Sequence, residues 1–73
     1  MELVPVQSTN LSHIGYDPDT MTMQIQFRSG GLYAYQNIEP DTYNAMMGSG
    51  DVGKYFAEII KPQRNRYVFT RVY

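Results

Sequence analysis

The sequence predicts a small α+β domain, an antiparallel β-meander of four or five strands with two short helices inserted before the last strand and packed on one face. Three observations lead there. Residues 20–28 alternate polar and apolar side chains, residues 52–60 carry an apolar stripe at helical spacing, and residues 66–72 alternate again. Strands joined by short turns pair antiparallel, so the order of these segments predicts a meander. A chain of 73 residues makes one domain, residues 1–73.

The strands are expected in a simple order. Residues 2–6 predict a short edge strand, because Pro5 cannot donate to a β-ladder. Residues 11–16 predict a second strand, and the Asp-Pro-Asp-Thr sequence at 17–20 predicts a turn. Residues 20–28 and 32–38 then form a hairpin, because Ser29-Gly30-Gly31 supplies the glycine that a tight turn needs.

The length of the hairpin loop decides where Tyr33 and Tyr35 point. With a two-residue turn, both rings share the face of Gln24, Gln26 and Arg28 and form an exposed aromatic platform beside a cation. With a three-residue loop and a glycine bulge, each side chain of the second arm lies on the opposite face of the sheet, and the tyrosines join the core. The glycine pair allows either loop, so both alternatives stay open.

Two helices are expected between the hairpin and the last strand. Pro40 suits the first position of a helix, and an apolar face follows at residues 43, 46 and 47. The second helix carries its apolar stripe at residues 52, 55, 56, 59 and 60, and Pro62 ends it. Arg66 to Val72 then reads as the final strand.

The glycine-rich segment between the helices, Gly48 to Lys54, matches Gly-x-Gly-x-x-Gly. A dinucleotide-binding loop must follow a strand, and this one follows a short helix, so that function is excluded. Backbone amides at the helix start, with Lys54 beside them, form a weaker candidate for holding a phosphate. The simpler interpretation, which we favour, is that Ser49 or Asp51 caps the helix.

Charge is divided unevenly along the chain. Residues 1–53 carry one arginine against six acidic residues, a net charge of −5, whereas residues 54–73 carry five basic residues against one acidic residue, a net charge of +4. The basic segment includes Arg64, Arg66 and Arg71 among aromatic residues, a mixture that suits a phosphate backbone and stacked bases. An ordinary solvated surface would give the same pattern.

Several functional classes find no support in the residues. There is one histidine, His13, no cysteine, and no assembled nucleophile and base, so we expect neither an enzyme nor a metal site, and no cofactor. No apolar run reaches the length of a membrane helix, so we expect no membrane partner. Absence of cysteine fits a reducing cytoplasm, and the small core of so short a chain makes a homo-oligomer reasonable.

One set of residues occurs in a distinctive order and spacing: Ser8, Leu11, Ile14-Gly15-Tyr16-Asp17, Phe27, Gly30 or Gly31, Tyr33-Ala-Tyr35, Ile38, Pro40, Tyr43, Ser49, Gly53, Tyr55-Phe56, Ile60 and a closing aromatic strand. This order and spacing resemble the KTSC domain family over nearly the whole chain, from about residue 6 to the end. The Tyr33-x-Tyr35 pair matches the central tyrosine motif of that family, while Met46-Met47-Gly48 departs from its leucine-rich helix end. The resemblance implies a small stand-alone bacterial or phage protein, or a relative of a tail found on some lysyl-tRNA synthetases. It implies no established activity, and RNA binding is a suggestion made for the family.

Two functional hypotheses follow. The first is a non-enzymatic module that binds RNA or a small nucleotide through a tyrosine face and the basic C-terminal segment. The second is a protein-interaction or self-assembling accessory module with no nucleic-acid ligand, because the chain holds more aromatic and methionine side chains than so short a domain can bury. The candidate ligand-binding residues are Arg28, Tyr33, Tyr35, Lys54, Arg64, Arg66 and Arg71.

Overall fold

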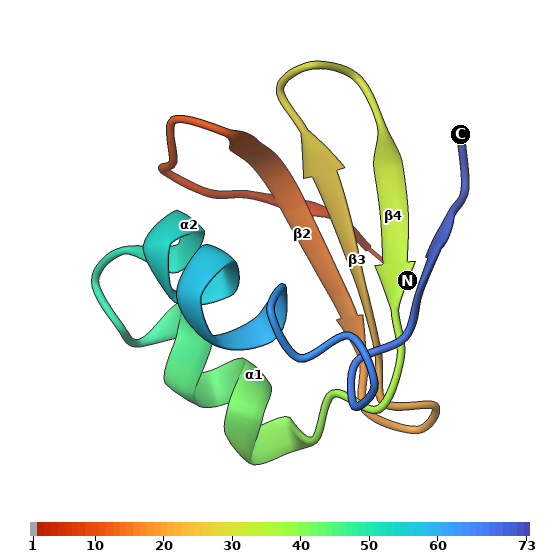
Figure 1. Cartoon of the computed structure of the whole chain (residues 1–73). Coiled ribbons are helices and arrows are strands. Elements are labelled where there is room, and N and C mark those ends of the chain that lie inside the picture. Colours follow the sequence, from red (N-terminus) through yellow and green to blue (C-terminus); the bar gives the residue numbers. More distant parts are fainter. Residues whose placement is uncertain (1) are drawn as a thin grey trace.

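The computed structural model describes residues 2–73 and contains one five-stranded antiparallel sheet whose spatial order follows the chain. Figure 1 shows the helices gathered on one face of this sheet, which we call the inner face, with the C-terminal strand at one edge. The predicted α+β meander, with its helices before the last strand, is therefore confirmed. The strands are β1 (Val4–Pro5), β2 (Leu11–Asp17), β3 (Thr22–Phe27), β4 (Leu32–Tyr35) and β5 (Phe69–Arg71).

The β3–β4 hairpin has a three-residue loop, not a two-residue turn. The Gly30 amide donates to the Phe27 carbonyl at 2.9 Å, and the Phe27 amide donates to the Gly31 carbonyl at 2.8 Å. Gly30 has a φ of 113°, a conformation that side-chain-bearing residues rarely adopt, so the loop is a turn closed by a glycine bulge.

This loop sets the parity of the whole hairpin. Tyr33 lies opposite Ile25 and Tyr35 opposite Met23, so both tyrosines share the inner face with core residues. The alternative that placed them beside Gln24, Gln26 and Arg28 on an exposed platform is wrong.

The helices follow as α1 (Pro40–Met47), α2 (Val52–Tyr55) and a wider π-helical turn, η1 (Phe56–Ile60). Pro40 begins α1 as expected, and the Asp51 carboxylate accepts the Lys54 amide at 3.0 Å, so Asp51 is the cap of α2. In η1 the Lys61 amide bonds to the carbonyl five residues back, on Phe56. This wider turn buries Phe56 and Ile60 but leaves Ile59 40% exposed, so the expected five-residue apolar stripe is wrong at Ile59.

The core lies between the inner face of the sheet and the helices. Tyr16 of β2 stacks on Tyr43 of α1 with ring centroids 4.3 Å apart, and the Tyr16 hydroxyl donates to the Ile38 carbonyl. These contacts fix α1 against the sheet. The clustered buried residues are Leu11, Ile14, Met23, Ile25, Tyr35, Ile38, Met46, Phe56, Ile60 and Tyr67.

Candidate ligand-binding site

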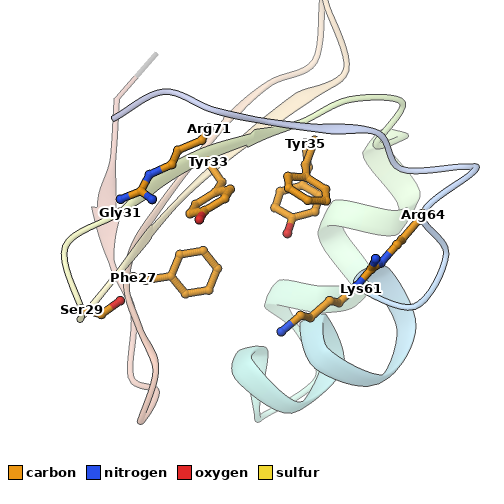
Figure 2. Close-up of a pocket in the computed structure, with 9 residues that line it drawn as sticks. Phe27, Ser29, Gly31, Tyr33, Tyr35, Lys61, Arg64 and Arg71 are labelled. Carbon is orange, nitrogen blue, oxygen red and sulfur yellow. The ribbon is translucent and has the colours of Figure 1, made fainter.

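A cavity of about 410 Å³ opens on the inner face, between the β4–β5 edge of the sheet and the segment that follows η1. Figure 2 shows aromatic rings on its sheet side and two basic side chains reaching toward them from the helical side. Its lining residues come from every part of the hairpin, from the loop after η1 and from β5. They are Phe27, Ser29, Gly31, Tyr33, Tyr35, Lys61, Arg64, Phe69 and Arg71.

Strand pairing explains why these residues meet. Tyr33 lies opposite Arg71 and Tyr35 opposite Phe69 in the β4–β5 ladder. Directly opposed residues share a face, and residues two apart on a strand share it too, so all four side chains emerge on the inner face. The final strand therefore places a cation and a ring beside the tyrosine pair.

The sheet side of the cavity is a connected set of aromatic rings. Tyr33 meets Phe27 edge-on at 5.3 Å between centroids and lies 5.8 Å from Phe69. Tyr35 lies 5.4 Å from Phe69 and meets Phe56 of the core edge-on at 5.2 Å. Because Phe56 is buried, the rings of the cavity are continuous with the core and are held in place by it.

Three cations surround these rings. The Arg71 guanidinium lies 5.7 Å from the Tyr33 ring centroid, and its Nε donates to the Tyr73 carbonyl at 3.1 Å. Lys61 and Arg64 approach from the helical side, so positive charge stands at both ends of the ring set (Figure 2). None of the nine lining residues is acidic, and the cavity is therefore electropositive.

The Tyr35 hydroxyl remains protonated well into the alkaline range. Burial is the main cause that raises the pKa of Tyr35 above its ordinary value of 10.0, and the neighbouring Tyr33 raises it further. Arg64 acts in the opposite direction, because a cation favours the phenolate. At neutral pH Tyr35 is therefore a neutral hydrogen-bond donor or acceptor at the edge of the cavity.

The structure brings together four of the seven candidate residues, Tyr33, Tyr35, Arg64 and Arg71, but separates the other three. The Arg28 Nε donates to the Ser8 carbonyl at 2.8 Å, and Arg28 lines a different hollow near β1. Lys54 lies in a shallow depression that also contains Asp51 and Glu58.

Arg66 also lies outside the cavity. Its Nη2 is 3.8 Å from the Glu39 carboxylate, and its guanidinium carbon is 5.3 Å from the Tyr67 ring centroid. It follows that closeness in sequence within residues 61–71 does not place every cation of this segment at one site.

Five lining residues were not among the candidates. Phe27 and Phe69 were detectable, since each alternates onto the same face as a tyrosine once the loop length is known, and Lys61 belongs to the basic segment. Ser29 and Gly31 gave no such signal. Gly31 has a packing role, because a Cβ there would stand 3.0 Å from Cε1 of Tyr33 and crowd its ring.

Neither a metal-binding cluster nor a membrane-crossing helix occurs in the part of the chain that the structure describes. Across residues 2–73, no three His, Asp or Glu side chains gather closely enough to hold a metal ion. None of the helices within those residues has the length and apolar character needed to cross a membrane.

Comparison with known proteins shows which family the chain belongs to. Residues 7–67 match the KTSC domain family. An uncharacterized protein of Stutzerimonas stutzeri is 36% identical over 67 residues, covering 92% of this chain and 94% of its own, and a Tsukamurella paurometabola protein is 27% identical over 59 residues, covering 81% and 88%. The crystal structure of a KTSC domain protein from Yersinia pestis superposes with a TM-score of 0.89 at 29% identity, covering 99% of this chain and 97% of that one. The chain belongs to the KTSC domain family.

Proposed function

We propose that this protein is a non-enzymatic binding module whose cavity holds a nucleotide, either free or as one unit of single-stranded RNA. The observation that carries the proposal is the composition of the cavity lining: four aromatic rings, three cations and no acidic residue. A nucleotide has a flat base that stacks on aromatic rings and a phosphate that pairs with Lys and Arg.

The size of the cavity supports one ligand unit. A volume of about 410 Å³ lies in the lower part of the range for small-molecule sites, which is roughly 300–1,000 Å³. Phe69 is 44% exposed, so its ring offers accessible surface for stacking, whereas Tyr35 is 5% exposed and serves as a fixed wall. Lys61 and Arg64 then stand where a phosphate attached to a stacked base would be neutralised.

Binding is tested by calorimetric titration of the protein with 5′-mononucleotides, the matching nucleosides and short single-stranded oligoribonucleotides at low salt. We expect nucleotides to bind more tightly than nucleosides, and affinity to fall as salt is raised, because the phosphate contacts are ionic. Tighter binding of the oligoribonucleotide than of the mononucleotide would identify RNA as the ligand, and equal binding would identify the free nucleotide.

The chain offers matched control variants. Arg64→Gln and Lys61→Gln should each weaken binding by about fivefold, equivalent to about 1 kcal/mol, whereas Arg28→Gln, Lys54→Gln and Arg66→Gln remove the same charge outside the cavity and should change little. An equal loss in both sets would show that only overall charge matters. No binding at low salt would contradict the proposal.

A further inference from the structure

The open edge of β5 (Phe69–Arg71) is the feature that the proposed function leaves unexplained. β5 is the outermost strand, and Figure 1 shows no element beyond it in the part of the chain drawn in colour. Large apolar side chains directly before and after these three residues face solvent, with Val68 49%, Val72 50% and Tyr73 61% exposed. The opposite edge differs, since β1 has only two residues and one of them is Pro5. An unprotected apolar edge strand is a template for pairing with another strand.

The backbone of β5 has free groups that point outward. The Gln36 amide donates to the Val68 carbonyl, and the Val72 amide donates to the Leu32 carbonyl. Alternate residues of an edge strand bond to its one neighbour, so residues 68, 70 and 72 face β4. The amides and carbonyls of Phe69 and Arg71 therefore point away from the sheet and can accept a new strand.

We propose that two copies of this chain pair antiparallel through β5, on a two-fold axis at Thr70, into a continuous ten-stranded sheet. With this register Phe69 of each copy forms a doubly hydrogen-bonded pair with Arg71 of the other, as the outward-pointing groups require. Val68 lies opposite the second copy's Val72, an apolar pair, and the two Thr70 side chains face each other. The strand is thus complementary to itself.

The neighbouring registers are less favourable. The two strands can bond only if residues with outward-pointing amides and carbonyls lie opposite each other. The nearest other positions of the axis that satisfy this condition are Phe69 and Arg71. An axis at Arg71 puts the two Arg71 guanidinium groups directly opposite each other, and like charges there are destabilising. An axis at Phe69 puts Arg71 opposite Tyr67, which precedes the strand and is buried in the core. Only the axis at Thr70 pairs residues 68–72 without either conflict.

The pairing also adds to the cavity. Phe69 and Arg71 both line it, and in the proposed dimer the second copy's Arg71 lies beside Phe69 on the same face. A guanidinium so placed can stack on the ring. Two cavities then adjoin across the axis and share their cations. The dimer does not depend on what the cavity binds, so the two proposals can fail separately.

The association is tested by sedimentation of the whole chain over a series of concentrations. We expect reversible dimerisation, and the pair of substitutions Val68→Lys and Val72→Lys should weaken it at least about tenfold, because lysines then oppose lysines at both ends. Both sites lie on solvent-exposed surface, so folding should be retained. A mixture of this variant with the Val68→Glu, Val72→Glu variant should restore dimers, whereas Val4→Lys on the β1 edge should change nothing.

The register is tested by cross-linking, which the absence of native cysteine makes direct. Thr70→Cys should form an intermolecular disulfide readily, since directly opposed Cα atoms that do not share hydrogen bonds are about 4.5 Å apart. Val68→Cys and Val72→Cys should each cross-link poorly alone and readily when mixed. A chain that stays monomeric at millimolar concentration, loss of dimers on Val4→Lys, or equal cross-linking of all three single variants would overturn the proposal.

Discussion

At the scale of single residues, Tyr35 joins the core to the cavity. Its ring is 5% exposed and meets the buried Phe56 edge-on, yet it also lies against Phe69 at the mouth of the cavity. A residue in this position gives the cavity a rigid wall, because a ring packed against the core has little freedom to move. Tyr33, half-buried and contacted by Arg71, adjoins it on the same strand.

Tyr35 should make the fold sensitive to alkali. Its pKa is raised in the folded state, chiefly by burial, so the folded form holds the phenol proton more tightly than the unfolded form does. The resulting stability is fully present below the ordinary pKa of 10.0 and is lost as pH rises through the folded value. We expect the urea midpoint of Tyr35→Phe to fall less than that of the natural sequence between about pH 9 and pH 11.

Absorbance near 295 nm checks the assignment to Tyr35, since tyrosinate absorbs there. Tyr35→Phe should remove a late-titrating component, and Arg64→Gln should move that component to still higher pH because Arg64 lowers the pKa of Tyr35. An unchanged titration curve in both variants would show that the Tyr35 environment differs from the one described.

Residue types alone singled out Tyr33, Tyr35, Arg64 and Arg71, which all line the cavity, but did not predict how they are arranged. Their chemistry, aromatic rings beside cations, is visible in the sequence. Which cations converge is decided by tertiary contacts that no local pattern carries, such as the Arg28 bond to the Ser8 carbonyl. Ser29 and Gly31 could not be predicted for the same reason, because they line the cavity only once the hairpin has closed.

At the scale of elements, the hairpin loop has the largest consequence. Alternation predicted both strands correctly, but the sequence Ser-Gly-Gly is compatible with two loop lengths, and the choice reverses the face of every residue on β4. The core settles it, because only the three-residue loop puts Tyr35 over Phe56. Element ends were harder to predict. The last strand spans three residues, Phe69–Arg71, where alternation suggested 66–72, because Tyr67 turns into the core.

Shortening this loop by one residue should therefore destabilise the fold severely. Deletion of Ser29 forces the two-residue parity, which takes Tyr35 out of the core at a cost of about 3–5 kcal/mol. A domain of this size has a total stability of roughly 4–11 kcal/mol. We expect far-UV circular dichroism and urea titration to show a largely unfolded or barely stable chain.

A matched insertion shows whether the deletion acts by moving the β4 side chains to the other face or only by changing the loop length. Adding two residues after Ser29 preserves the parity and should cost only about 1 kcal/mol, since closure entropy grows slowly with length. If the deletion were tolerated as well as the insertion, the face of the tyrosines would not depend on the loop.

At the scale of the whole molecule, both proposed interactions involve the same strand, β5. β5 supplies Phe69 and Arg71 to the cavity, and its outer edge offers the pairing surface. The uneven distribution of charge along the chain also becomes an uneven distribution in space, because Lys61, Arg64 and Arg71 of the basic segment all line the cavity. Sequence alone located the charge and the strands, while their meeting at one edge required the complete topology.

Thermal unfolding distinguishes the two roles of this strand. Free ligand at about ten times its Kd stabilises the folded state by about 1.4 kcal/mol, which raises Tm by roughly 5–10 °C in a domain this small. Dimerisation makes Tm rise with protein concentration even without ligand. We expect Val68→Lys with Val72→Lys to abolish the concentration dependence and retain a nucleotide shift. Arg64→Gln should retain the concentration dependence and reduce the nucleotide shift by about half, as fivefold weaker binding at the same ligand concentration requires. Arg71→Gln should reduce both, because Arg71 lines the cavity and also lies opposite Phe69 in the proposed pairing. If Arg71→Gln reduced only one of them, β5 would serve that role alone.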